Sequence, residues 1–423
     1  MCYEHSGSGY YDDTLFILGM VMKKKYLILG AGPAGLTVAN KLKEKGETDF
    51  LLVEKEKEVG GLCRSEKVDG SDLDIGGGHI LDVRRPEVNE FLFKFMPKEE
   101  WNIFDRDSKI HYKDSYLDHP FESNIWQMEL EDQLDFIESI SKAGCVKGEP
   151  KPEKFVEWIN WKLGEKVTEE YMLPYNQKMF GENLDQLGTY WLEKLPDVSF
   201  RETLQSCLEH KPYGKEPGHA QFYYPKEYGY GELWLRMGKA VEENLLLNSN
   251  VISLDVANKT VEMSDGTKVE FETLITTIPW DCFEAIDGAD SSIIEKISTL
   301  KHTSVDVEYF GEELDTTSHW IYEPNPELSY HRILVRPNFF PGSKGYWTET
   351  NSDRVHLKTR EGSYHYLNEY AYPLNTIGKN ETMAEILSYM KDRGVIGLGR
   401  WGEWQHYNSD VTVKLAMDLS EGI

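Results

Sequence analysis

Residues 26–35 read YLILGAGPAG, and this stretch decides the fold. Its first four residues are apolar, as in a buried parallel strand, and residues 36–45 after the glycine turn have the pattern of a helix. In such a strand–turn–helix unit, Gly30 makes the turn, Gly32 lets the backbone approach a pyrophosphate, and Gly35 packs the helix on the strand. The helix N-terminus then faces the phosphates. The stretch therefore predicts a dinucleotide site.

A second apolar run at residues 49–53 predicts the neighbouring strand, and Glu54 follows it, 19 residues after Gly35. An acid at this distance typically accepts hydrogen bonds from the ribose hydroxyls of a dinucleotide. A glycine motif alone is a weak indication. The order of strand, glycine turn, helix, strand and acid makes it a specific one.

More glycine-rich segments follow at residues 59–65 (VGGLCRS) and 73–79 (LDIGGGH), and residues 397–402 read GLGRWG. Such points of backbone approach suit a long, extended cofactor. The arrangement resembles the large FAD family that includes amine oxidases, phytoene desaturases and UDP-galactopyranose mutases. The resemblance implies these FAD-binding residues: Gly30, Gly32, Pro33, Ala34, Gly35, Glu54, Lys55, Gly60, Gly61, Leu62, Gly78, His79, Val251, Gly399, Arg400, Asp410 and Val411.

The 423 residues carry a net charge of −27, which excludes nucleic acid and anionic membranes as default partners. An anionic small substrate would need a local cluster of Arg, Lys or Tyr. No apolar run reaches the length of a membrane span. Residues 1–21 are interpreted as a peripheral extension, or as an upstream start with Met20 or Met22 as the alternative beginning. The five cysteines are scattered and form no C-x-x-C pair, which predicts a reducing, cytoplasmic location and no Cys-rich metal site.

The expected fold class is α/β, with a glutathione-reductase-like FAD-binding Rossmann domain, a helical insert and a mixed β-sheet substrate domain. We assign the FAD domain to residues 22–85, 219–282 and 385–423, the helical domain to 86–218 and the sheet domain to 283–384. Within 86–215, helices are predicted at residues 87–95, 130–141, 152–163 and 168–175.

Within the FAD family, the chain resembles the UDP-galactopyranose mutases most, and the longer eukaryotic type among them. The resemblance rests on the order of several segments, which are DIGGGH (74–79), PFESNI (120–125), PYNQK (174–178), WIY (320–322), YHR (330–332), AYP (371–373) and GRWGEW (399–404). It implies isomerisation of a nucleotide sugar between pyranose and furanose forms, with N5 of reduced FAD as the nucleophile. NAD(P)H is one candidate reductant.

The same resemblance implies the substrate site. Arg332 matches the diphosphate-binding arginine, and a guanidinium can hold a phosphate through two bonds. His79 matches a histidine at the flavin edge and, with Arg332, is the catalytic candidate. The other substrate-binding candidates are Phe121, Asn176, Phe180, Lys194, Tyr322, Tyr372 and His406.

The chain departs from the mutase pattern at several of these positions. Lys194 stands in the region where the family has a second diphosphate-binding arginine, and Arg201 follows seven residues later. His406 replaces a phosphate-binding tyrosine. His119 stands where a uridine-stacking tyrosine is usual, and Glu122 where the eukaryotic type has glutamine. These changes leave the sugar and the base open.

Two other classes of protein compete with the mutase interpretation. One is an FAD oxidoreductase of the amine oxidase, desaturase or protoporphyrinogen oxidase type, which would carry out net electron transfer and use an apolar tunnel. The other is a flavoprotein without catalysis. The sequence also leaves a homo-oligomer open.

Overall fold

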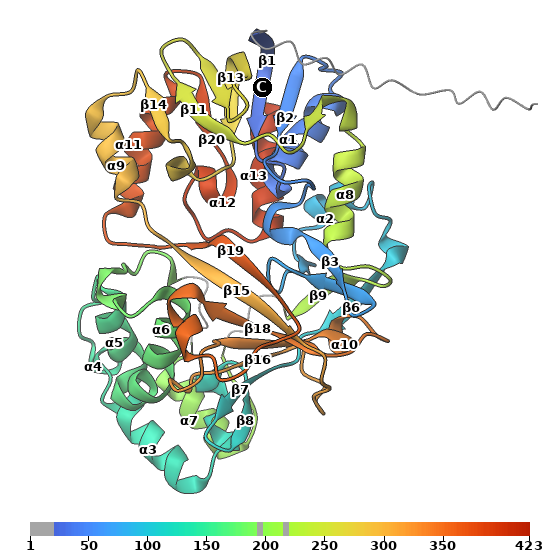
Figure 1. The fold of residues 1–423 in the computed structure, drawn as a ribbon. Helices are drawn as coiled ribbons and strands as arrows, with labels where there is room; N and C mark the ends of the chain where they lie inside the picture. The colour runs from blue at the N-terminus through green and yellow to red at the C-terminus, as the bar shows by residue number, and fades with distance from the viewer. Residues whose placement is uncertain (1–20, 193–197, 215–219) are drawn as a thin grey trace, which may run out of the picture.

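The computed structural model describes residues 21–192, 198–214 and 220–423. Figure 1 shows two lobes, with the nucleotide-type sheet and its helices in one and a second sheet flanked by a helical layer in the other. Strands β15 (His302–Phe310) and β19 (Tyr364–Pro373) run along the junction between the lobes. The expected combination of a Rossmann-type domain with a mixed substrate sheet is confirmed.

The first lobe is built on a sheet with the order β10-β2-β1-β13-β12-β11-β14, and β20 also pairs with β13. Its strands are β1 (Val21–Leu29), β2 (Phe50–Val53), β10 (Leu245–Leu246), β11 (Val251–Asp255), β12 (Thr260–Met263), β13 (Lys268–Thr276), β14 (Ala285–Asp287) and β20 (Val395–Gly397). Central strand β1 pairs in parallel with both β2 and β13. A glycine turn that follows such a strand therefore opens at the carboxyl edge of the sheet, where ligands of α/β folds bind.

Helices cover both faces of this sheet, which explains the continuous apolar run of β1. Ile28 packs with the cluster around Leu36 and Trp234, while its neighbours Leu27 and Leu29 pack with the cluster on the other face. Successive strand residues point to opposite faces, so a strand covered on both sides needs apolar residues throughout. The helices of this lobe are α1 (Pro33–Glu44), α2 (Pro86–Leu92), α8 (Gly231–Lys239), α9 (Ser291–Ser298), α11 (Lys379–Lys391), α12 (Gly399–Gly402) and α13 (Ser409–Glu421).

The second lobe contains a sheet with the order β19-β15-β18-β17-β16-β7-β8. Its remaining strands are β7 (Ser108–Tyr112), β8 (Ser115–Asp118), β16 (Trp320–Tyr322), β17 (Arg332–Val335) and β18 (Tyr346–Asn351). The helical layer beside it comprises α3 (Leu130–Ser141), α4 (Gly144–Lys147), α5 (Phe155–Val167), a π-helical turn η5 (Thr168–Met172), α6 (Leu173–Phe180) and α7 (Phe200–Glu209), while α10 (Arg336–Phe339) is a single turn after β17.

The expectation that residues 86–215 are mostly helical is confirmed for the described residues, but strands in this range were not predicted. This range also holds strands β6 (Trp101–Asp105), β7 and β8, and β7 pairs in parallel with β16. The segment 108–112 alternates between buried and half-buried residues, which is the period of a strand. The predicted helix at residues 130–141 is confirmed with the same bounds. The domain boundaries stay a prediction.

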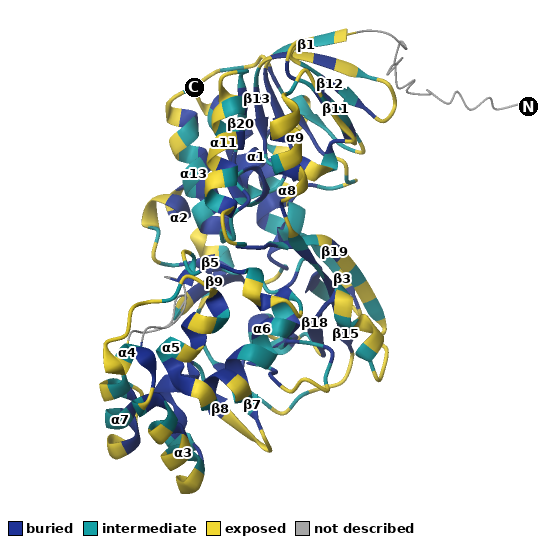
Figure 2. Ribbon diagram, turned by 90° about the vertical axis from the view of Figure 1, so that its left-hand side faces the viewer, coloured by how far each residue is buried: buried dark blue, intermediate teal, exposed yellow. Residues whose placement is uncertain are grey.

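Two small sheets connect the lobes, β3 (Ser65–Val68) with β4 (Ser71–Asp74), and β5 (Leu81–Asp82) with β9 (Gln221–Pro225) and β6. Figure 2 shows exposed residues on the outer helices and also along β19, whereas β18 is buried throughout. Within the described ranges, no helix is both long enough and apolar enough to cross a membrane.

Candidate active site

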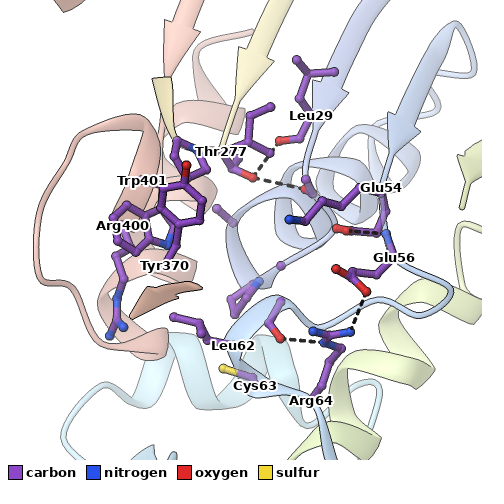
Figure 3. A pocket seen from close by; sticks show the side chains of 18 of the residues that line it. Leu29, Glu54, Glu56, Leu62, Cys63, Arg64, Thr277, Tyr370, Arg400 and Trp401 are labelled. Carbon is purple, nitrogen blue, oxygen red and sulfur yellow. Dashed lines mark hydrogen bonds and ion pairs between the residues drawn. The ribbon is translucent and has the colours of Figure 1, made fainter. Parts of the chain in front are cut away.

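The glycine turns of the first lobe surround a cavity of about 330 Å³, called here the nucleotide groove. Figure 3 shows Glu54, Glu56 and Arg64 on one side of it and Tyr370, Arg400 and Trp401 on the other. The predicted FAD-binding residues that line it are Gly30, Gly32, Pro33, Ala34, Glu54, Lys55, Gly61, Leu62, His79, Val251 and Arg400.

The glycines of the first turn differ in what surrounds them. A Cβ on Gly35 would lie 1.9 Å from the Gly30 carbonyl oxygen, so close packing of the chain on itself requires this glycine. Gly30 has φ +91, a conformation that favours glycine. A Cβ on Gly32, by contrast, would meet only the Gly61 Cα, at 3.9 Å. Packing of the protein therefore does not require Gly32 to be a glycine, whereas close approach of a ligand would.

The N-terminus of α1 opens into the groove and offers unpaired backbone donors. Pro33 occupies the first turn, and among the described residues no side chain caps the helix. The first N–H groups of a helix lack internal partners, and the helix dipole makes this end positive. Gly32, Pro33 and Ala34 line the groove here. Donors, dipole and open space fit the pyrophosphate of FAD.

Glu54 is held in place at the end of β2. Its two carboxylate oxygens accept hydrogen bonds from the N–H groups of Ala31 (2.7 Å) and Glu56 (3.0 Å). Burial raises the pKa of Glu54, and these two hydrogen bonds act in the opposite direction. A carboxylate oxygen has more than one acceptor direction, so a fixed Glu54 can still receive ribose hydroxyls.

The other predicted cofactor residues do not line the nucleotide groove. Gly35 and Gly60 shape its turns, and Gly399 packs on Ala34, where a Cβ would approach the Ala34 Cβ to 3.0 Å. Asp410 is buried and forms an ion pair with Arg85 at 2.6 Å. Two further residues, Gly78 and Val411, line a different cavity.

That second cavity, of about 550 Å³, is called here the substrate cavity. Leu62, His79, Arg400 and Ser409 line both cavities, so the two spaces share a wall. The predicted substrate residues that line it are Phe121, Asn176, Phe180, Tyr322, Arg332, Tyr372 and His406. Lys194 lies outside the described residues. The structure thus brings the described candidates together, and their roles stay predictions.

Arg332 is tied to a buried carboxylate. Its Nε lies 3.1 Å from Oε2 of Glu349, and the Gly78 N–H donates to the other oxygen, Oε1, at 2.9 Å. Glu349 is 1% exposed, and despite this burial the Arg332 guanidinium holds the pKa of Glu349 well below its usual range. This pair fixes Arg332 against the loop that carries His79.

His79 is neutral at physiological pH. Burial, together with the charges of Arg400 and Arg332, lowers the pKa of His79 to about 4. Its Nδ1 lies 3.1 Å from the carbonyl oxygen of Gly77. Because a carbonyl only accepts, Nδ1 carries the proton and Nε2 is left as an acceptor.

Arg400 contributes a charge to the shared wall. Its Nε and Nη2 donate to the Tyr407 carbonyl oxygen at 3.0 and 2.7 Å, and its Nη1 donates to that of Ala371 at 3.0 Å. Burial lowers the pKa of Arg400. Held by carbonyls rather than by a carboxylate, the guanidinium keeps its positive field at the junction of the two cavities.

Aromatic rings form another part of the substrate cavity. Phe121 stacks on Tyr171 with ring centroids 4.8 Å apart and an interplanar angle of 8°. Asn176 anchors its amide by donating to the Met172 carbonyl oxygen at 2.7 Å. Elsewhere in the cavity, His406 lies against Tyr372, with 4.9 Å between the ring centroids.

A sequence profile described as "Flavin containing amine oxidoreductase" matches residues 33–287, more than half of the chain. The chain belongs to this family. The predicted membership of the FAD superfamily is therefore confirmed. The family accounts for the nucleotide groove, whose backbone donors and open glycine suit a flavin dinucleotide.

Sequence relatives cover only parts of this family member. It is 50% identical over 52 residues to "Uncharacterized protein in nifH2 3'region" of Methanothermococcus thermolithotrophicus, covering 12% of this chain and 49% of that one. It is 28% identical over 67 residues to polyamine oxidase 7 of Oryza sativa subsp. japonica, covering 16% of this chain and 14% of that one. The chain thus spans less than half the length of these curated relatives.

Solved structures resemble this family member along nearly its whole length. A reduced UDP-galactopyranose mutase is 22% identical, with a TM-score of 0.86 over 94% of this chain and 95% of that one. A putrescine oxidase bound to putrescine is 13% identical, with a TM-score of 0.62 over 95% of this chain and 99% of that one. At these identities the likenesses show the fold, and the mutase-like fold that the sequence predicted is confirmed.

One guanidinium in the substrate cavity of this flavin family member, that of Arg106, was not predicted from the sequence. Arg106, between β6 and β7, donates from Nη2 to the Tyr322 hydroxyl at 2.9 Å and stacks over the Trp320 ring, 4.8 Å from its centroid. No sequence motif includes Arg106, so nothing in the sequence indicated that this residue belongs to the site. Its position follows from the parallel pairing of β7 with β16, which only the fold reveals.

Arginines outnumber carboxylates in the described lining of the substrate cavity although the protein is strongly acidic, and three of these arginines, Arg84, Arg85 and Arg332, are ion-paired with Asp82, Asp410 and Glu349. Among the described residues that line it, the charged side chains are Arg84, Arg85, Arg106, Arg332, Arg400, Glu122 and Glu349. A focused positive field of this kind attracts an anionic ligand against a negative global field. The arrangement can hold an anion beside the wall that the cavity shares with the nucleotide groove.

Proposed function

We propose that the protein isomerises a nucleotide sugar between its pyranose and furanose forms, with UDP-galactopyranose and UDP-galactofuranose as the substrate pair and reduced FAD as cofactor. One observation carries the proposal: a cavity rich in arginine and tyrosine shares a wall with the nucleotide groove. A nucleotide sugar has a dianionic diphosphate between a flat base and a polar sugar, and the lining offers a partner for each part.

Arg332, Tyr322 and Tyr372 are the proposed diphosphate ligands. Tyr322 on β16 pairs with Arg332 on β17 in the sheet register, so the two side chains rise from neighbouring strands. Arg106 approaches the same tyrosine hydroxyl and supplies a second guanidinium. Charge-assisted bonds from a guanidinium to phosphate are among the stronger polar contacts in proteins. Together they would hold the leaving nucleotide and keep it in place for recombination.

The shared wall would orient the sugar toward the cofactor. When bound, reduced FAD supplies the nucleophile for the anomeric carbon, so the protein itself needs few acid–base groups. Neutral His79 offers Nε2 as an acceptor at the wall and holds no proton to give there. Arg400 and the N-terminus of α13 favour negative charge at this point, and a reduced flavin carries such charge.

The main alternative is net oxidation of a substrate by FAD, as in the amine oxidases. A polyamine such as putrescine is a cation, and the arginines of this cavity would repel it. An oxidase with an anionic substrate would still be compatible with the arginines of the substrate cavity. The two alternatives therefore have to be separated by their electron balance rather than by charge.

The decisive experiment is to incubate dithionite-reduced and oxidised protein with UDP-galactofuranose and to quantify UDP-galactopyranose by chromatography. We expect turnover with reduced protein only, with many turnovers for each flavin reduced. Conversion by oxidised protein, or consumption of one NAD(P)H per sugar, would contradict the proposal and favour the oxidoreductase. Oxidised protein kept under nitrogen is the control for reduction by light or buffer.

A further inference from the structure

Strand β19 forms part of the wall of the nucleotide groove, although it belongs to the sheet of the second lobe. Successive residues of a strand point to opposite faces, so Tyr364, Tyr366 and Asn368 share one face of β19. The residues between them, His365 and Leu367, are exposed. The face that carries the two tyrosines and the asparagine therefore turns toward the interior, where the groove lies.

Hydrogen bonds join this face of β19 to the segment that leads from the glycine turns into the β3–β4 hairpin. They connect Tyr364 with Glu66 at 2.9 Å, Tyr366 with Arg64 at 2.6 Å, and Asn368 with the Ile75 carbonyl oxygen at 2.8 Å. Of the two tyrosines, only Tyr366 lines the groove, and its partner Arg64 lines it as well. The contact between Tyr366 and Arg64 is therefore part of the cofactor site.

The guanidinium of Arg64 is held on three sides. Its Nε donates to the Gly61 carbonyl oxygen at 3.0 Å, and its Nη2 donates to the Tyr366 hydroxyl. Its Nη1 lies 3.4 Å from a carboxylate oxygen of Glu56, an ion pair that Figure 3 shows. The guanidinium also lies over the Tyr366 ring, 5.4 Å from the centroid. Because the guanidinium is rigid and planar, these partners leave it one orientation.

The contact lies at the end of the groove that holds Glu54. The N–H of Glu56 donates to Glu54 at 3.0 Å, and the Glu56 carboxylate pairs with Arg64, so these three side chains are neighbours. Glu54 is the predicted ribose ligand, whereas His79 and Arg400 form the wall that the groove shares with the substrate cavity. In this arrangement Arg64 and Tyr366 meet beside the ADP half of FAD.

The Tyr366 hydroxyl keeps a proton to donate. Its oxygen accepts a hydrogen bond from the cationic Arg64, and no acceptor within the described residues takes its proton. A phenol carries one O–H donor in addition to its acceptor lone pairs, and a bond accepted from a cation polarises that O–H. Since Tyr366 lines the groove, its proton can go to a phosphate or ribose oxygen of a bound dinucleotide.

We propose that Arg64 and Tyr366 form a clasp that holds β19 of the second lobe over the ADP half of FAD and slows release of the cofactor. The proposal rests on the cofactor of the proposed function, and it applies to a mutase and to an oxidoreductase alike. Opening the clasp breaks the bond between Arg64 and Tyr366, together with the bond from the Tyr366 hydroxyl to FAD.

The test measures the rate at which FAD leaves. The FAD-loaded protein is diluted into buffer without flavin, and the rise in flavin fluorescence is followed. Tyr366→Phe keeps the ring and removes the hydroxyl, so we expect release to become at least about tenfold faster, the equivalent of one hydrogen bond to a charged group. Tyr364→Phe is the matched control, since it removes a hydroxyl bound to a carboxylate on the same face of β19 but outside the groove. It should release FAD at the wild-type rate.

A second variant, Arg64→Met, tests whether the two residues act as one unit. It should also release FAD at least about tenfold faster. In this background Tyr366→Phe should add less than about threefold, because the clasp is already open. Thermal unfolding of the flavin-stripped proteins is the check on folding. Tyr366→Phe and Tyr364→Phe should lower the unfolding temperature by similar amounts, because each removes one hydroxyl bound to a charged group.

Three results would overturn the clasp while leaving the bound FAD in place. The first is an equal rate of release from the wild type and Tyr366→Phe. The second is an equal acceleration in Tyr366→Phe and Tyr364→Phe, which would mean a general contact between the lobes. The third is a full effect of Tyr366→Phe in the Arg64→Met background, which would mean that the two residues act independently.

A wild type that takes up no FAD would overturn the cofactor assignment and the clasp with it. The release rates are measured without any nucleotide sugar. A protein that retains FAD through the clasp but does not isomerise UDP-galactofuranose would therefore contradict the proposed function alone.

Discussion

The nucleotide groove and the substrate cavity share a wall, yet they are built in different ways. The groove depends on backbone, with the glycine turn, the uncapped start of α1 and N–H groups that hold Glu54. The substrate cavity depends on side chains, which come from both lobes and from segments between residues 62 and 411. Backbone recognition needs glycine at given places, so its sequence pattern lies within one short stretch. Side-chain recognition can draw one residue from each of many segments.

The two spaces also differ in charge. The groove offers an uncapped helix start and a fixed carboxylate for a cofactor, while the cavity gathers arginines in a protein with a net charge of −27. The difference predicts that changes in the groove act on FAD and changes in the cavity act on the substrate. The following experiments are ordered from the largest expected effect to the smallest.

The largest effect should come from Gly32→Val. Its φ of −78 suits any residue, and a side chain there would enter the groove rather than the protein. We expect a folded protein that has lost nearly all flavin absorbance at about 450 nm, because the pyrophosphate can no longer approach the backbone. Gly35→Val should instead fail to fold, since its Cβ would overlap the Gly30 carbonyl.

Flavin content per chain and thermal unfolding measure this contrast, with flavin-stripped wild type as the control. Gly32→Val should unfold at the same temperature as that control. A yellow Gly32→Val protein would break the comparison, because it would show that the groove does not hold the cofactor through its backbone.

The next largest effect concerns Arg332→Ala. A charge-assisted contact is worth about 1.5–3 kcal/mol, so UDP binding should weaken by about one to two orders of magnitude with FAD content unchanged. The change also leaves Glu349 buried without its cation, which should lower the free energy of unfolding by about 3–5 kcal/mol.

The double variant Arg332→Ala/Glu349→Gln separates these two effects. It should regain most of the lost stability, because the buried charge is gone, while UDP binding stays weak. Stability from denaturant unfolding and affinity from UDP titration are the two readouts. Recovery of UDP binding in the double variant would remove Arg332 from the diphosphate site.

A smaller effect is expected for Arg106→Gln. Its guanidinium is already engaged by the Tyr322 and Ser108 hydroxyls, so only part of its charge is available to a ligand. UDP affinity should fall by about threefold to tenfold, which is less than the one to two orders of magnitude expected for a full charge-assisted contact. Arg84→Gln is the matched control, since the Arg84 side chain is 60% exposed and paired with Asp82. An equal loss in both variants would mean a general field rather than a specific contact.

The smallest effect concerns His79 and pH. A neutral ring with a pKa of about 4 gives no inflection in turnover between about pH 5 and pH 8, and His79→Ala should lower the rate while FAD stays bound.

Because the pKa of His79 in the folded protein lies below its unfolded value of 6.5, the unfolded chain binds the proton more readily. Stability should therefore fall as pH drops from 6.5 toward 4, and less steeply in His79→Ala.

Several features of the fold were open to prediction because their signals are local. The strand, glycine turn, helix, strand and acid of residues 26–54 all lie within one short stretch, and helix α3 begins and ends where its apolar spacing indicates. Strands β6, β7 and β8 were missed in a range dominated by helical patterns. Short strands carry few residues of alternation, and β6 and β7 pair with β9 and β16, which come from distant parts of the chain, while β8 pairs with β7.

The sequence by itself determined the nucleotide groove, because a helix start and its glycines recognise phosphate through backbone that the local sequence shapes. Only the tertiary structure decided which charges meet in the substrate cavity. Arg106 reaches Tyr322 through a parallel strand pair, and Glu349 reaches Arg332 and Gly78 across two strands and a loop. The physical reason is range: backbone conformation is set by neighbours in sequence, whereas a buried ion pair is set by neighbours in space.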